Sequence, residues 1–212
     1  MLNFSTEENI FSEGWGMLGA IDEAGRGPLA GPVVAAIVLV APNFIFDQKK
    51  YKLIRDSKKL SEAKREEAYD LIMSDFSEVK VGWCDHETID RINILQATFL
   101  AMKKALGALK SKPDLVIVDG SFKIPNISQK QRAIIKGDAT VFSIAAASII
   151  AKVTRDRLMR KFHETYPVYE FAQHKGYGTK LHLEKIKEYG PSPIHRLSFA
   201  PLNGIITKKK PR

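Results

Sequence analysis

Short apolar runs along the chain alternate with segments of helical periodicity. Met17–Ile21 form one apolar run that the acidic pair Asp22 and Glu23 ends, and Val33–Val40 form a second run after a turn rich in glycine and proline. Two β-rich runs that flank such a turn are typical of an antiparallel hairpin. The pattern therefore predicts two paired strands, with two carboxylates at the end of the first strand.

The same periods predict the remaining elements. Further strands are expected over residues 78–83, 115–118 and 133–135. Helices are expected over residues 61–76 and 93–110, from about residue 140 past residue 160, and over residues 181–189. Residues 42–60 are polar and predict a loop. This mixed α/β order indicates one central sheet covered by helices. We place this unit at residues 1–165 and a small C-terminal helical extension at residues 166–212, which ends in the basic tail ITKKKPR.

The composition narrows the classes of function. Lys and Arg number 33 against 24 for Asp and Glu, and the net charge of +9 suits a polyanionic partner. No apolar run is long enough to span a membrane, and the N-terminus lacks the pattern of a secretory signal. The single cysteine, Cys84, excludes a disulfide framework, so a reducing cytoplasm is the expected location.

Acidic residues end two of the predicted strands. Asp22 and Glu23 end the first, and Asp119 ends another. Because ligands of open α/β sheets bind where strands end, these carboxylates would converge if the two strands are neighbours. Asp138, just before a predicted helix, could join them. Carboxylates that lie close together repel one another, and a hard cation such as Mg²⁺ reverses that cost. The pattern thus indicates a site for divalent metal ions.

Each carboxylate also has an ordinary structural interpretation. The acids that end the two strands could be turn residues, and Asp138 could simply cap a helix. Spacing alone does not show that the four side chains meet, so both interpretations stay open at this level.

Glycines follow the acidic pair in the sequence AGRGPLAGP. Gly25, Gly27 and Ala30 superficially fit the dinucleotide-binding pattern G-x-G-x-x-A, but that pattern opens a helix. Here Pro28 and Pro32 lead into a β-branched strand, so we reject a dinucleotide site. Glycine also permits close approach of the backbone to a ligand, so the loop could bind a sugar hydroxyl or a phosphate. A tight turn without a binding role is the alternative.

Basic and aromatic residues follow in the second half of the chain. Ser148, Lys152 and Arg155 share one helix face, which could track phosphates or simply be solvated. Tyr177 lies between two glycines, so its ring could stack on a base or a sugar, or belong to the core. The histidines of this region have no tetrahedral spacing with the lone cysteine, so zinc is not expected, and His195 is interpreted as structural.

Taken together, these motifs resemble those of bacterial ribonuclease HII. The matching stretches are IDEAGRGPLAGPVVAA at 21–36, DSKKLS at 56–61, NILQATFLAM at 93–102, VDG at 118–120, KGD at 136–138, SIAAASIIAKVTRDR at 143–157, HKGYGT at 174–179 and GPSPIHRLSF at 190–199. They cover the chain from about Leu18 to Phe199, and their length and order argue against chance agreement. The sister family, ribonuclease HIII, is less similar, because we expect a different turn after the acidic pair and an extra N-terminal domain.

The resemblance implies the ribonuclease H-like fold: a five-stranded mixed sheet flanked by helices, with a small C-terminal helical extension. It implies an endoribonuclease that hydrolyses the RNA strand of RNA–DNA hybrids and cuts 5′ of single ribonucleotides in duplex DNA, as in ribonucleotide excision repair. Two divalent ions, Mg²⁺ or Mn²⁺, would take part, and the products would carry 3′-hydroxyl and 5′-phosphate ends. The expected partners are these nucleic acids, with no membrane, and a monomer is expected.

The resemblance also implies roles for individual residues. The metal-binding and catalytic set is Asp22, Glu23, Asp119 and Asp138. The substrate-contacting set is Gly25, Arg26 and Gly27 at the ribonucleotide 2′-hydroxyl, Tyr177 on the adjacent sugar, and Lys58, Lys152 and Arg155 at phosphates. Residues 42–55 and the two termini match the family least, and no role is carried over to them.

Three other classes of protein compete with this interpretation. A binding module of the same fold would not cut, and a structural protein with a basic tail would leave the four acids unexplained. A junction resolvase or DNA transposase of the same fold would not need a loop and a tyrosine that read a 2′-hydroxyl. Cutting that requires one 2′-hydroxyl in an otherwise DNA duplex distinguishes all three from a ribonuclease.

Overall fold

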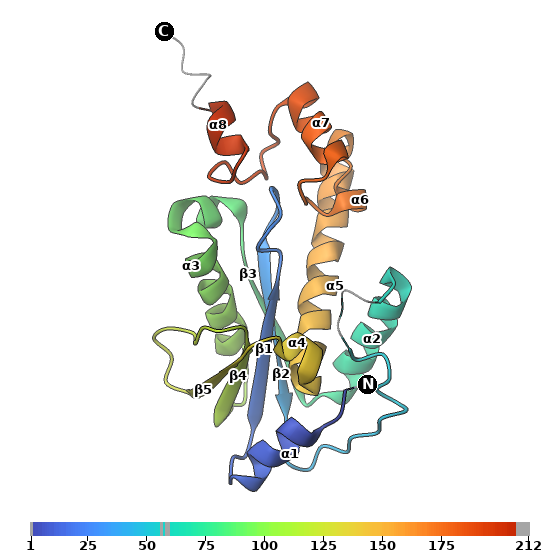
Figure 1. Cartoon of the computed structure of the whole chain (residues 1–212), viewed down its shortest axis with the longest axis vertical. Helices are drawn as coiled ribbons and strands as arrows, with labels where there is room; N and C mark the ends of the chain where they lie inside the picture. The colour runs from blue at the N-terminus through green and yellow to red at the C-terminus, as the bar shows by residue number, and fades with distance from the viewer. Residues whose placement is uncertain (1, 56, 58–59, 207–212) are drawn as a thin grey trace.

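A computed structural model describes residues 2–55, 57 and 60–206 of the chain. Its centre is one sheet of five strands in the order β3-β2-β1-β4-β5 (Figure 1). The strands are β1 (Leu18–Ala24), β2 (Val33–Val40), β3 (Glu78–Cys84), β4 (Leu115–Asp119) and β5 (Lys130–Ile134). β2 pairs antiparallel with β1 and β3, whereas β4 runs parallel to β1 and β5. The expected five-stranded mixed sheet is therefore confirmed.

The predicted hairpin is the core of this sheet. β2 is buried along its whole length because β1 and β3 flank it and helices cover both faces, which explains its uninterrupted apolar sequence. Glu23 pairs with Ala35, and Ala24 pairs with Val34. This register leaves residues 25–32 as a loop beyond the ends of both strands.

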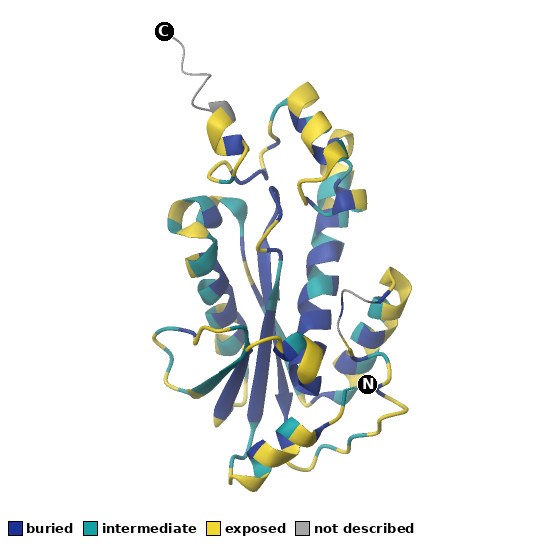
Figure 2. Ribbon diagram, viewed as in Figure 1, coloured by how far each residue is buried: buried dark blue, intermediate teal, exposed yellow. Residues whose placement is uncertain are grey.

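Helices cover both faces of the sheet. They are α1 (Ser5–Ser12), α2 (Glu62–Asp75), α3 (His86–Gly107), α4 (Gly137–Thr140), α5 (Phe142–Thr165), α6 (Phe171–His174), α7 (Lys180–Tyr189) and α8 (Leu202–Ile206), with a 3-10 helix at Pro167–Tyr169. α3 packs on one face, α5 packs on the other, and α2 packs against α5. Figure 2 shows the buried residues on the strands and on the inner sides of these helices. No described helix combines the length and apolarity that a membrane span requires.

Two helical segments beside the predicted helices were not predicted, and one predicted boundary was wrong. The chain is already helical from His86, and this first segment was not predicted. It ends at Asn93 (φ 66°), where the expected helix begins and where the Asn93 side chain accepts a hydrogen bond from the N–H of Gln96. The helix expected from about Thr140 past Arg160 is α5, and the short helix α4 that precedes it across Val141 was not predicted. β5 begins at Lys130, earlier than expected, because this edge strand is polar and only partly buried.

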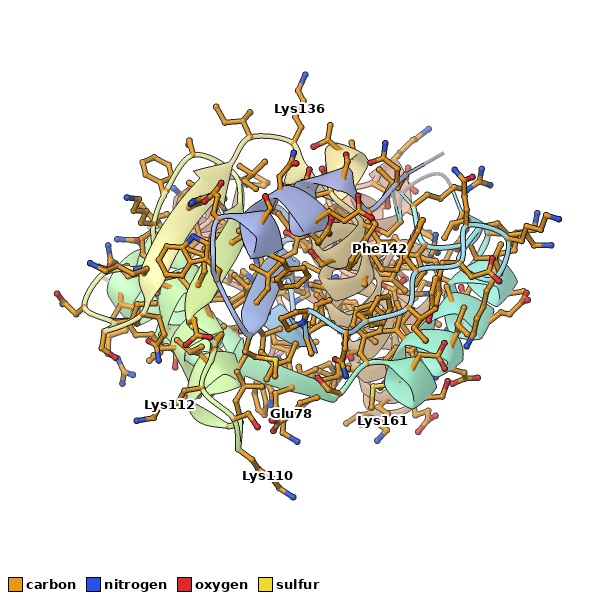
Figure 3. The ribbon with its side chains drawn as sticks, turned by 90° about the horizontal axis from the view of Figure 1, so that it is seen from below. Glu78, Lys110, Lys112, Lys136, Phe142 and Lys161 are labelled. Carbon is orange, nitrogen blue, oxygen red and sulfur yellow. The ribbon has the colours of Figure 1, made fainter. Side chains whose placement is uncertain are left out.

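Residues 42–55, which look like a polar loop in the sequence, contribute rings to an aromatic cluster. Phe142, the first residue of α5, lies at its centre, with ring centroids 5.0–6.0 Å from those of Phe4, Phe44, Phe46, Tyr51 and Phe76. In Figure 3, Phe142 lies toward the middle of the molecule, whereas Lys110 and Lys112 extend outward. Buried and partly buried rings therefore anchor this segment, although many of its residues are polar.

The C-terminal helices gather at the end of the sheet where β1 stops. In Figure 1 they lie at the top, around the loop of residues 25–32. The backbone N–H of Leu29 donates to the carbonyl of Gly176 at 2.8 Å, and that of Gly31 donates to the carbonyl of Ile194 at 2.9 Å. The glycine-rich loop is thus part of the contact between the sheet and the C-terminal segment.

The N-terminal helix supplies a cap to α5. α1 was not predicted, since only Glu7 and Ile10 of its residues are buried. The Glu7 carboxylate accepts hydrogen bonds from the backbone N–H of Ser143 at 2.8 Å and from the Ser143 hydroxyl at 2.6 Å. The N-cap residue of α5, Val141, offers no side-chain hydrogen bond of its own. Glu7 therefore satisfies an N–H of the first turn that the local sequence leaves open.

We predict that Glu7→Ala lowers the free energy of unfolding by about 2 kcal/mol, because it removes this cap and leaves a buried N–H without a partner. Urea denaturation measures the change. Glu8→Ala is the matched control, because Glu8 is exposed on the same helix. Equal stability of the two variants would contradict the capping role.

Candidate active site

Strand register brings two of the predicted carboxylates together. β1 and β4 are parallel neighbours, and Ile21 pairs with Val118. Asp22 and Asp119 are the next residues, so they stand side by side where the pairing of the two strands ends. Ile21 and Val118 belong to the core under α3, so alternation turns Asp22 and Asp119 toward α5 and turns Glu23 toward α3. One end of the strand pair thereby holds three carboxylates.

Asp22 is the most enclosed member, with 4% of its surface exposed. Its Oδ1 accepts a hydrogen bond from the backbone N–H of Glu23 at 2.7 Å, and the hydroxyl of Ser148 on α5 favours its charged form. Burial raises the pKa of Asp22 well above its ordinary value, and the charges of Glu23 and Asp119 raise it further. Ser148 also lies 3.2 Å from the hydroxyl of Ser57. A buried acid is therefore held between the sheet and α5.

The other acids form a connected series with Asp22. Burial raises the pKa of Glu23, although its ion pair with Arg26 (3.2 Å) opposes that shift. Asp119 Oδ1 accepts a hydrogen bond from the backbone N–H of Asp138, on α4, at 3.2 Å. Burial raises the pKa of Asp119, and the charge of Asp138 raises it as well. All four predicted carboxylates thus lie in one electrostatic neighbourhood.

This set of oxygens suits a hard divalent cation. A cation offsets the desolvation and repulsion that raise these pKa values, and carboxylate oxygens are ligands that Mg²⁺ and Mn²⁺ prefer. Within the described residues, no three His, Cys, Asp or Glu side chains by themselves surround a position for an ion. An ion bound here would therefore complete its coordination with oxygens from water or from a phosphate.

Two buried arginines hold the loop of residues 25–32 from behind. Arg155 of α5 is 1% exposed, and Arg196, which precedes α8, is 0% exposed. Arg155 donates to the carbonyls of Ala30, Pro32 and Lys175 at 2.9–3.1 Å. Arg196 donates to the carbonyls of Gly25, Arg26 and Gly31 at 2.7–3.0 Å. Glycine is required at position 25, because φ is +94° and a Cβ would lie 2.1 Å from Arg155 Nε.

Tyr177 lies on the outer side of this loop. Tyr177 is 44% exposed, and a Cβ at Gly27 would lie 3.9 Å from its ring atom Cε1. The ammonium group of Lys152 lies 5.9 Å from the ring centroid and pairs with Asp156 at 2.8 Å. Gly27, Tyr177 and Lys152 therefore form one accessible surface beside the loop that follows the carboxylates.

One of the expected phosphate contacts needs correction. The guanidinium of Arg155 is enclosed and donates to three backbone carbonyls, so the structure gives it a role in holding the loop and no access to a phosphate. Lys152, on the same helix face, remains partly exposed. Lys58 lies outside the described residues.

Sequence reasoning missed two residues of this region. Arg196 reaches carbonyls that precede it by 165 to 171 positions, so no local pattern indicates its role. Ser148 was assigned to a helix face, but its contact with Asp22 depends on how α5 packs on β1. Both lie inside motifs that a pattern of spacing alone does not interpret.

Histidines form a chain of hydrogen bonds beneath Tyr177. His182 Nδ1 lies 2.9 Å from the carbonyl of Tyr177, and its Nε2 lies 2.9 Å from Nε2 of His195. His195 Nδ1 accepts a hydrogen bond from the backbone N–H of Ser192 at 2.8 Å. Because a carbonyl only accepts, His182 donates through Nδ1, and His195 then donates through Nε2. Each imidazole is therefore neutral and in one tautomer.

Burial keeps this chain neutral. Burial, together with a smaller effect of the neighbouring imidazoles, lowers the pKa of His182 from 6.5 to about 4 and the pKa of His195 to about 3. The unfolded chain binds these protons near pH 6.5, whereas the folded protein does not. The stabilisation is therefore complete above pH 6.5 and is lost as the pH falls toward the folded pKa values.

Comparison with solved structures defines the class of protein. The structure resembles ribonuclease H2 from Pyrococcus horikoshii OT3, with a TM-score of 0.74 and 28% identity over 91% of this chain and 98% of that one. It also resembles the ribonuclease HII from Archaeoglobus fulgidus that was solved in complex with PCNA, with a TM-score of 0.72 and 28% identity over 86% and 95% of the two chains. The chain is thus a hydrolase of the ribonuclease H class, with the ribonuclease H-like fold.

Sequence comparison identifies the family within this class. The family model for ribonuclease HII matches residues 18–202. The ribonuclease HII of Endomicrobium trichonymphae is 49% identical over 98% of this chain and 96% of that protein, and that of Caldicellulosiruptor bescii is 51% identical over 92% of each. The chain belongs to the ribonuclease HII family, as its motifs predicted.

We predict that the pH dependence of stability between pH 6.5 and 4.5 becomes shallower in His182→Gln, because each buried neutral imidazole contributes up to about 1.4 kcal/mol per pH unit in that range. Urea unfolding at several pH values measures the slope. His163→Gln, which removes an imidazole that does not belong to the hydrogen-bonded pair of His182 and His195, is the matched control. An unchanged slope in His182→Gln would show that the histidine chain does not resist protonation in the folded state.

Proposed function

We propose that the chain is a cytoplasmic endoribonuclease that hydrolyses the RNA strand of RNA–DNA hybrids and cuts on the 5′ side of single ribonucleotides in duplex DNA. The observation that carries the proposal is the pairing of Ile21 with Val118, which seats Asp22 and Asp119 side by side at the end of two parallel strands. Relatives that are about half identical over nearly the whole chain bear the name ribonuclease HII. The lone cysteine, buried and unpaired, supports the assignment to the cytoplasm.

Two Mg²⁺ or Mn²⁺ ions would be held by Asp22, Glu23, Asp119 and Asp138. When bound, such ions activate water for in-line attack on the phosphate and stabilise the leaving 3′ oxygen, so the products carry 3′-hydroxyl and 5′-phosphate ends. The protein's own task is to orient the acids before an ion arrives. The Glu23 N–H and the Ser148 hydroxyl hold Asp22, and the Asp138 N–H holds Asp119.

Recognition of the substrate would depend on the loop of residues 25–32 and on the C-terminal segment. Only the 2′-hydroxyl distinguishes RNA from DNA locally, so a reader needs donors and a surface close to one sugar. Gly25, Arg26 and Gly27 supply backbone beside Glu23, and the exposed ring of Tyr177 supplies a surface for the neighbouring sugar. Residues 1–165 would thus carry the chemistry, and residues 166–212 would contribute to recognition.

Charge supports a nucleic-acid substrate. The chain has a net charge of +9 although its proposed site is acidic. Such a field attracts a polyanion, and bound divalent ions would bring the phosphate to the carboxylates. Lys152, partly exposed beside Tyr177, would contact the backbone of the substrate.

A labelled DNA duplex that contains one ribonucleotide tests the proposal. We predict a single cut on the 5′ side of the ribonucleotide when Mg²⁺ or Mn²⁺ is present, and none with EDTA or in the all-DNA duplex. Denaturing gel electrophoresis resolves the products. Binding without any cut would favour a binding module, and cutting of both duplexes would exclude reading of the 2′-hydroxyl.

We predict that Asp119→Asn reduces this metal-dependent cutting by more than about 100-fold, because it removes a charged ligand from the centre of the acidic series. Circular dichroism checks that the fold persists. Asp70→Asn, an exposed position on α2, is the control for the same chemical change. Full activity of a folded Asp119→Asn variant would overturn the assignment of the metal site.

A further inference from the structure

The carbonyl groups of the glycine-rich loop are nearly all turned inward. Six of these carbonyl groups accept hydrogen bonds from Arg155 or Arg196. They belong to Gly25, Arg26, Leu29, Ala30, Gly31 and Pro32. Arg196 holds the first two, which directly follow the acidic end of β1. Arg155 holds the far end of the loop, at Ala30 and Pro32.

These contacts are strong constraints, because both cations are buried and their guanidinium hydrogen bonds go to backbone carbonyls. Burial lowers the pKa of Arg155 to about 10 and that of Arg196 to about 9, so both remain charged at neutral pH. A buried charge must keep its hydrogen-bond partners, since each lost partner leaves it incompletely solvated. A planar guanidinium also fixes the directions in which these carbonyls lie.

Because the carbonyl groups point inward, peptide geometry makes the N–H groups that follow them point outward. In a trans peptide the C=O and the following N–H point in opposite directions. Arg196 holds the carbonyls of Gly25 and Arg26, so the N–H groups of Arg26 and Gly27 point away from the buried guanidinium. Arg26 and Gly27 are exposed, whereas Gly25 is buried. Within the described part of the chain, neither N–H group has an internal acceptor. Two adjacent donors therefore face outward beside the carboxylates.

We propose that Arg196 is a positioning residue for recognition of the 2′-hydroxyl. It acts without touching the substrate, by turning the amides of Arg26 and Gly27 toward the position of one sugar oxygen. The inference rests on the proposed function, and it adds a residue and a physical cause to it. Arg155 has a different role, because it holds the other end of the loop. Its Cζ lies 5.8 Å from the centroid of the Tyr177 ring.

Arg196→Lys tests this role, because lysine keeps the charge and loses the planar fork that holds two carbonyls at once. The readout is binding in EDTA, where no cutting occurs, measured by fluorescence anisotropy. The two probes are a DNA duplex with one ribonucleotide and the identical all-DNA duplex. We expect the variant to keep its affinity for the all-DNA duplex within about twofold and to lose about tenfold in its preference for the ribonucleotide, the equivalent of one well-placed hydrogen bond.

Arg157→Lys is the matched control, because Arg157 lies on α5 and pairs with Glu66 away from the loop. It should leave both affinities unchanged. A folded Arg196→Lys variant with the full preference of the wild type would overturn the positioning role. If the wild type itself shows no preference, the proposed function fails instead, so the two failures are distinguishable.

A second measurement needs no variant and applies even if Arg196→Lys does not fold. Hydrogen exchange followed by NMR reports on the amides of Arg26 and Gly27 in the wild type. We expect the ribonucleotide duplex to slow the exchange of both amides and the all-DNA duplex to leave it fast. Equal slowing by the two duplexes, or no slowing by either, would contradict the outward donors that Arg196 is proposed to create.

Discussion

The parallel pairing of β1 with β4 is the constraint on which the rest of the site depends. Because Ile21 pairs with Val118, Asp22 and Asp119 must be neighbours. A shift of one residue in the strand register would turn one of the two side chains to the other face of the sheet. The free-energy cost of adjacent buried acids is met by specific donors, among them Ser148 from α5. The core on both faces of the sheet therefore also serves to keep two like charges together.

The sheet and the C-terminal segment contribute opposite charges to the proposed site. The sheet presents negative charge, whereas the C-terminal segment contributes a buried positive charge, Arg196, that never reaches the surface. Its effect is transmitted through backbone carbonyls, and the neutral histidines support the carbonyl of Tyr177 in a similar way. Buried polar side chains of the C-terminal segment thus determine which backbone and side-chain groups are exposed at the surface.

The sequence predicted elements whose signals are local. The hairpin followed from two apolar runs around a glycine- and proline-rich turn, and the acids followed from their places at strand ends. α1 was missed because, of its side chains, Glu7 and Ile10 alone are buried. The first segment of α3 was missed because the non-helical backbone of Asn93 separates it from the periodic helix that follows. The role of Arg196 depends on a contact across the whole chain. The resemblance to ribonuclease HII named the acidic set, whereas only the packing shows how its members are held.

The clamp of Arg196 on Arg26 joins residues 170 positions apart. A chain that leaves the ribosome from its N-terminus can pair β1 with β2 early, and can add β4 and its aspartate well before the arginine has been synthesised. The hydrogen bonds of Arg196 to the loop of residues 25–32 can form only after nearly the whole polypeptide is available. A product of translation that stops before Arg196 would lack them, so the recognition of a sugar that we propose for this loop would require the C-terminal segment.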